Sequence, residues 1–146
     1  MYANVVLASF AKVSDNMLDV QAGGWSFIGP GVVQFFVAGV LHCPWHESNQ
    51  KQKHAFSIEL LDADGAAVEN PEKGEPAKVD GEFEIGRPPG TKPGTSVPAP
   101  FAFPFGGWEL DAGEQYEIRL TIDGETQEGW RLPFTVRERP PDVLAA

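Results

Sequence analysis

The sequence has one cysteine, no long apolar run and few basic residues, and each scarcity excludes a class of protein. Cys43 alone cannot form an internal disulfide, so we expect a reducing compartment, the cytoplasm, or a virion assembled there. The longest apolar run, residues 32–41, is far shorter than the roughly 20 residues of a membrane helix, so no membrane association is expected. With a net charge of −10 and 11 lysines and arginines, the chain is not expected to bind nucleic acid.

Sustained helical periodicity is also missing. The 16 glycines and 13 prolines are scattered along the chain, which disfavours long helices and favours turns. Short runs rich in Val, Ile and Phe recur between turn signals, as is typical of strands. They predict about eight strands, over residues 5–13, 18–22, 32–41, 56–60, 79–85, 101–105, 116–122 and 130–136. We expect an all-β fold, a two-sheet antiparallel β-sandwich of the immunoglobulin-like, Greek-key type.

The turns and the ends of the chain refine this prediction. Asp123-Gly124 is a strong type I′ signal and predicts a hairpin between residues 116–122 and 130–136. One β-sandwich domain is expected over residues 1–136, followed by a polar, proline-containing tail over residues 137–146.

Tyr116 supports the sandwich in particular. It follows an Asp-x-Gly turn at the head of a strand, which is the tyrosine-corner arrangement. In that arrangement the phenol group bonds to backbone across the turn while the ring closes the core. Ile118 stands where an antibody domain has a cysteine.

All three histidines and the cysteine lie within thirteen residues, at His42, Cys43, His46 and His54. Imidazole and thiolate are good zinc ligands, so this segment is a candidate metal or small-ligand site. However, the spacing matches no common zinc pattern, and Pro44 prevents a helix that would align His42 with His46. The other interpretation is a strand end followed by a turn, with Cys43 as a small buried apolar residue and no cofactor.

Charge is distributed very unevenly. Of the 32 Lys, Arg, Asp and Glu residues, only Lys12, Asp15, Asp19 and Glu47 fall within the first fifty residues. Interfaces are depleted of charged side chains and enriched in aromatic ones. Two interpretations remain open: this segment forms a protein interface, or its strands are the centre of the sandwich. The interface candidates are Trp25, Phe27 and Ile28, which lie outside any clean strand alternation.

Several segments together form a recognisable pattern: residues 4–13, 18–25 (Leu-Asp-Val-Gln-Ala-Gly-Gly-Trp), 44–49 (Pro-Trp-His-Glu-Ser-Asn), 60–65, 86–90, 93–95 and 122–125. In these the chain resembles an uncharacterised family of small all-β proteins from bacteria and their phages. The resemblance implies a β-sandwich and brings no established activity or catalytic residues.

Within that pattern, the loop around Trp45 has a physical interpretation. Trp45 is expected to cap the core, while Glu47, Asn49 and His54 could form a hydrogen-bonded clamp across the loop. Such a clamp would make His54 a structural residue.

We therefore expect a non-enzymatic binding or assembly module that presents Trp25, Phe27 and Ile28 to a protein partner or to a second copy. A phage structural or accessory protein is one concrete form. The alternative is a small-ligand or metal-binding protein with its site at residues 42–54.

Overall fold

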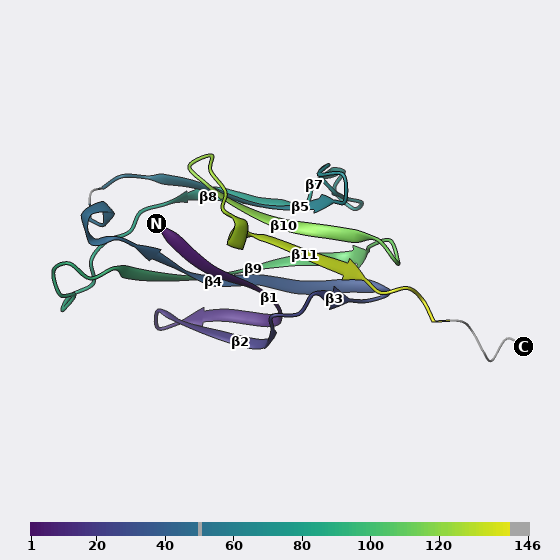
Figure 1. Ribbon diagram of the computed structural model, residues 1–146, viewed down its shortest axis with the longest axis horizontal. Helices are drawn as coiled ribbons and strands as arrows, with labels where there is room; N and C mark the ends of the chain where they lie inside the picture. The colour runs from purple at the N-terminus through teal and green to yellow at the C-terminus, as the bar shows by residue number, and fades with distance from the viewer. Residues whose placement is uncertain (50, 141–146) are drawn as a thin grey trace, which may run out of the picture.

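The alternating apolar runs of the sequence form two β-sheets that pack face to face in the computed structural model, which describes residues 1–49 and 51–140 (Figure 1). The first sheet, in the order β2-β1-β4-β9, consists of β1 (Tyr2–Ser14), β2 (Met17–Gly23), β4 (Val32–Cys43) and β9 (Val97–Glu109). The second, in the order β3-β11-β10-β5-β8, consists of β3 (Phe27–Ile28), β5 (His54–Asp62), β8 (Lys78–Phe83), β10 (Gln115–Ile122) and β11 (Arg131–Val136). The predicted all-β sandwich is confirmed.

The remaining elements are short. A small hairpin pairs β6 (Glu69–Asn70) with β7 (Glu75–Pro76), and two single 3₁₀ turns are η1 (Trp45–Glu47) and η2 (Glu128–Trp130). Within the described residues, the predicted eight strands correspond to the eight that have six or more residues.

The connectivity is that of an immunoglobulin-like domain. With β1, β4 and β9 taken as strands A, B and E, one sheet reads A-B-E, and β8, β5, β10 and β11 then read C′-C-F-G. All pairings within the two main sheets are antiparallel except that of β3 with β11, which is parallel.

The two-sided apolar run of the sequence is the central strand β4. Val33, Phe35 and Val37 face the second sheet and are almost fully buried. The alternate residues Phe36 and Val40 lie on the outer face, where they are half-buried. β4 pairs with β1 on one side and β9 on the other, so the strand is covered along both edges.

The hairpin after β10 differs from the expectation. Asp123 and Gly124 have positive φ angles of 51° and 79°, as a type I′ turn requires, but only Ile122 and Glu125 bridge directly across them. Residues 126–130 then loop out through η2, and regular pairing begins at Arg131 opposite Arg119.

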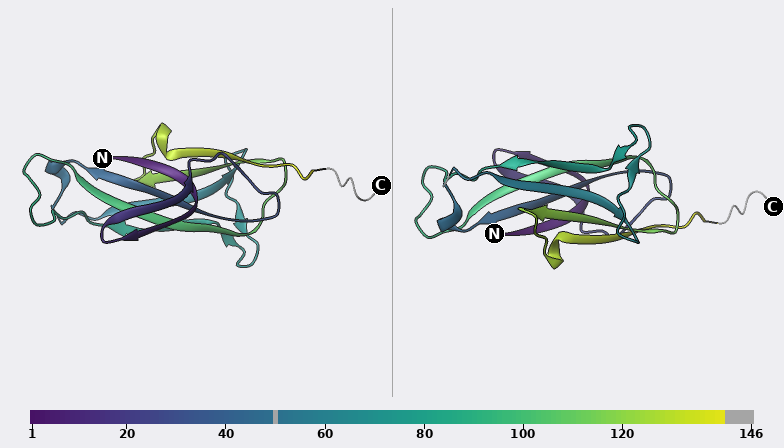
Figure 2. Two further views of the ribbon diagram at one scale, coloured as in Figure 1. Left: turned by 90° about the horizontal axis from the view of Figure 1, so that it is seen from below. Right: turned by 90° about the horizontal axis from the view of Figure 1, so that it is seen from above.

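The other hairpin, β1–β2, continues beyond the last pairing of β1 with β4. β1 pairs with β4 only as far as Ala8, and from there on with β2 alone. The turn at Asp15 and Asn16 has φ angles of 52° and 57°. Residues 9–22 therefore form a two-stranded arm, which crosses the outer face of the first sheet (Figure 2, left).

After β11 the chain leaves the sandwich. Arg137 still donates its backbone N–H to the carbonyl of Ile28, and Arg139 forms an ion pair with Glu109. The end of the predicted tail, residues 141–146, lies outside the described residues. In the part of the chain that the structure describes, no helix has the length and apolar character needed to cross a membrane.

Candidate functional site

The predicted His–Cys cluster is spread over separate surroundings. His42 stacks on the ring of Tyr2, with ring centres 4.6 Å apart. Cys43 points into the core and is completely buried, and this burial raises the pKa of its thiol. His46 is 80% exposed and lies 3.8 Å from a carboxylate oxygen of Glu47. The three side chains therefore face in different directions.

His54 belongs to another site altogether. It is 6% exposed, and its Nδ1 lies 2.7 Å from Oδ2 of Asp123 in the turn after β10. Over the described residues, no three side chains of His, Cys, Asp or Glu are grouped so that they could hold a metal ion. The geometry thus adds no support to a metal site at residues 42–54.

The Trp45 loop is held by side chains that the sequence did not single out. The guanidinium carbon of Arg87 lies 3.5 Å from the centre of the Trp45 ring. Arg87 donates to Ser48 Oγ and to the carbonyl of Trp45, and the Ser48 hydroxyl donates to the same carbonyl. The loop is therefore held by Arg87 and the buried Ser48. The sequence had predicted a clamp of Glu47, Asn49 and His54 at this place.

Asn49 and Glu47 have other roles in this loop. Asn49 adopts a left-handed conformation, with φ of 58°, and its N–H donates to the carbonyl of Ile85. A carboxylate oxygen of Glu47 lies 3.7 Å from the N-terminal ammonium group of Met1. The sequence placed Arg87 only within the segment 86–90 of the resemblance and did not connect it with Trp45, because it lies about forty residues from the loop it holds.

Tyr116 makes the contact that a tyrosine corner requires. Its hydroxyl accepts a hydrogen bond of 3.0 Å from the backbone N–H of Asp111, and its ring stacks on Phe134. Burial raises the pKa of the Tyr116 phenol, as expected for a phenol that closes the core.

The three interface candidates differ in their surroundings. Trp25 is half-buried and lies edge-to-face on Phe35 and Phe134, so it plugs the core between the sheets. Phe27 is 54% exposed on β3, and Ile28 beside it is half-buried. Of the three, Phe27 offers most surface to a partner.

Exposed apolar side chains gather in the part of the chain that is poor in charge. All the large hydrophobic residues that are exposed among the described residues lie within the first 32: Tyr2, Phe10, Val13, Met17, Val20, Phe27 and Val32. Four of them, at positions 10, 13, 17 and 20, belong to the arm. The charge distribution pointed to this segment, but not to these residues, because it does not show which side chains of the arm are covered, as Ala11 is, and which are exposed.

Comparison with known proteins gives a family without an activity. The model of DUF6941, described as a family of unknown function, matches residues 6–137. No curated protein matches the chain, and neither does any solved structure.

Proposed function

The chain belongs to DUF6941, a family of unknown function, and we propose that it is a non-enzymatic assembly module. It pairs with a second copy of itself through the arm, residues 9–22. The observation that carries this proposal is the confinement of the exposed large hydrophobic side chains to the first 32 residues, four of them on the arm. Exposed apolar surface beyond scattered single residues marks an interaction site. The register of β1 and β2 places Phe10 and Met17 on one face of the arm and Val13 and Val20 on the other, so a partner that pairs along the edge of β2 can reach both pairs.

The arm needs support that the sandwich provides only in part. A two-stranded hairpin by itself is marginally stable in water. Phe10 anchors the arm by an edge-to-face contact with Phe36, whose ring centre is 5.2 Å away. Val13, Met17 and Val20 have 39–64% of their surface exposed, so a partner that covers them would stabilise the arm.

The edges of the sheets favour β2 as the strand that pairs. β9 carries Pro98, Pro100 and Pro104, which have no N–H to donate. β8 presents charged residues, among them Lys78 and Asp80, and β3 has only two residues. β2 has seven residues with Asp19 as its single charge, so it is the least protected edge in the described chain.

The charge of the arm favours a second copy of the chain as its partner. The arm carries Lys12, Asp15 and Asp19, and Lys12 lies directly across from Asp19. A basic partner would find little negative charge to bind on this surface, and an acidic partner little positive charge. An antiparallel β2–β2 pair centred on Val20 would place Asp19 opposite Gln21 of the other copy, so no like charges would meet.

Phe27 on β3 offers a second exposed apolar side chain to a partner, whereas Trp25 packs against the core. A structural or accessory part in a phage particle would be one setting for such a module, and it rests on the sequence resemblance alone. The single buried Cys43 suits assembly in the cytoplasm.

Native mass spectrometry and light scattering on the purified protein test the proposal. The unmodified chain should be a dimer, and Met17→Lys with Val20→Lys should weaken the dimer by at least roughly tenfold, because lysine on an open edge opposes pairing. Ala63→Lys with Ala66→Lys adds the same two charges at an exposed loop and should leave the dimer intact.

Two results would contradict the proposal. A monomer at all concentrations would remove self-assembly and leave a different protein as the partner. A dimer that survives the double substitution but is lost in Phe27→Lys would move the interface from the arm to β3.

A further inference from the structure

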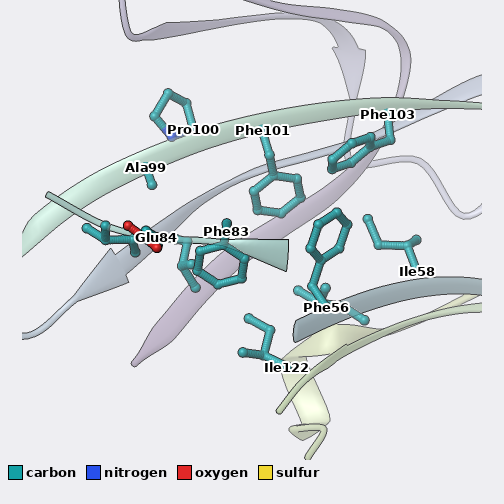
Figure 3. A pocket seen from close by; sticks show the side chains of 12 residues that line it. Phe56, Ile58, Phe83, Glu84, Ala99, Pro100, Phe101, Phe103 and Ile122 are labelled. Atoms are coloured by element: carbon teal, nitrogen blue, oxygen red, sulfur yellow. The ribbon is translucent and has the colours of Figure 1, made fainter. Parts of the chain in front are cut away.

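A second feature, unconnected with the arm, lies between the two edge strands β8 and β9. A cavity of about 170 Å³, open to solvent on one side, lies between the sheets here. Figure 3 shows Ala99, Phe101 and Phe103 of β9 on one side of it and Phe56 of β5 and Phe83 of β8 on the other. Pro100, between Ala99 and Phe101 on β9, also lines the cavity.

Large rings hold this side of the sandwich open. Phe56 stacks on Phe103 with ring centres 5.4 Å apart, and Phe83 lies 6.0 Å from Phe56. Phe101 lies so close to Gly39 that a Cβ there would be 2.9 Å from its ring. Because each ring packs against backbone or against another ring, none of them can move into the cavity and fill it.

The lining determines what part of a ligand can enter. Among the lining residues, Glu84 is the only one with a polar side chain, and it is exposed at the mouth. A polar atom deeper inside would lose its hydrogen bonds to water without finding new ones. An apolar cavity of about 150 Å³ in another protein stays dry and takes up benzene, so this cavity has room for a hydrocarbon group of that size.

Charge at the mouth determines the other end of the ligand. Lys53 and Lys78 lie beside Glu82 and Asp80 respectively, whereas Glu84 has no ion-pair partner among the described residues. Arg87, the nearest basic residue along the chain, is engaged with Trp45 and Ser48. A net charge of −10 adds to the attraction for a cation and to the repulsion of a carboxylate.

We infer that this cavity binds a small organic amine, whose aromatic or alkyl group of about six carbons fills the space between β8 and β9 while its ammonium group lies beside Glu84. The site shares no residue with the arm, so a test of ligand binding does not decide whether the protein assembles, and a test of assembly does not decide whether the cavity binds a ligand.

Three probes that share a phenyl ring test this inference: benzylamine, toluene and benzoate, each titrated at pH 7 while side-chain NMR signals of the cavity residues are followed. Benzylamine should bind best, toluene more weakly and benzoate at least roughly tenfold more weakly than benzylamine. Glu84→Gln should remove most of the difference between benzylamine and toluene, without change in toluene binding.

Substitutions on β9 show where the probes bind. Ala99→Leu fills the cavity and should abolish binding of all three. Ala102→Leu adds the same volume on the outer face of the same strand and should not affect binding.

Three results would overturn the inference. Absence of binding by every probe would show that the cavity takes no ligand of this class. Equal binding of benzylamine and toluene, unchanged by Glu84→Gln, would remove the amine. Binding that persists in Ala99→Leu would place the probes elsewhere. In each case the oligomeric state of the protein reports separately on the arm.

Discussion

The imidazole of His54 and the carboxylate of Asp123 join the start of β5 to the end of β10, with 2.7 Å between Nδ1 and Oδ2. The other carboxylate oxygen of Asp123 accepts the N–H of Ala55 at 2.9 Å, and the Asp123 N–H donates to the carbonyl of Ala55 at 2.8 Å. A turn residue is thereby attached to a neighbouring strand by three contacts. The His54 ring also stacks on Phe83, a wall of the cavity.

This pair predicts a dependence of stability on pH. The hydrogen bonds from His54 and then Ala55 hold the pKa of Asp123 below its ordinary value of 3.8. A carboxyl whose pKa is lowered by folding stabilises the protein above its unfolded pKa, and the contribution is lost as pH falls through the folded pKa. Asp123→Asn should therefore cost about 1 kcal/mol or less near neutral pH, since half of the carboxylate is exposed and screened.

Urea denaturation at several pH values measures this effect. The difference between the unmodified chain and Asp123→Asn should shrink once the pH is below 3.8. Asp64→Asn, in an exposed turn, serves as the control. A difference that stays constant down to acid pH would mean that the charge of Asp123 has no part in it.

The tyrosine corner predicts an effect of one hydroxyl group. Tyr116→Phe keeps the ring on Phe134 and leaves the N–H of Asp111 without its partner, at a cost of about 1–2 kcal/mol. Thermal and urea unfolding should show this loss. Tyr2→Phe changes the other tyrosine, which is exposed, and should have no measurable effect. Equal stability of the two variants would deny the hydroxyl of Tyr116 any role.

Gly39 predicts a cost of close packing. A Cβ at Gly39 would lie 2.2 Å from the carbonyl oxygen of Asn4 on the neighbouring strand β1. Gly39→Ala should therefore destabilise the protein by about 2 kcal/mol or more, since the obstacle is backbone. At Gly81 a Cβ would lie 3.1 Å from the ring of Phe56, which can shift. Gly81→Ala should cost less, and the reverse order in urea unfolding would refute this account of the two glycines.

The clamp of the Trp45 loop predicts that arginine cannot be replaced by lysine. Arg87→Lys keeps the charge but loses the planar fork that reaches Ser48 and the Trp45 carbonyl together. We expect a loss of about 1–2 kcal/mol and a shift in the fluorescence of Trp45. Arg131→Lys, at an exposed position, should change neither. Wild-type fluorescence and stability in Arg87→Lys would show that the loop is held by other contacts.

The sequence predicted the segment that contains the candidate interface, but not which of its side chains are exposed. The depletion of charge in the first fifty residues pointed to the segment that contains the arm. It did not separate Trp25, which enters the core, from Phe27, which is exposed. Both are aromatic residues near glycines, and only the packing of Phe35 and Phe134 against Trp25 distinguishes them.

The sequence by itself determined the all-β class, the main strands and the turn at Asp123-Gly124, because side-chain alternation and turn preferences are local. Only the tertiary structure decided that His54 meets Asp123, that Arg87 lies on Trp45, and that a cavity remains beside Phe101. These contacts join residues far apart in the chain. They depend on which strands become neighbours and how two sheets face each other, and no short stretch of sequence encodes that arrangement.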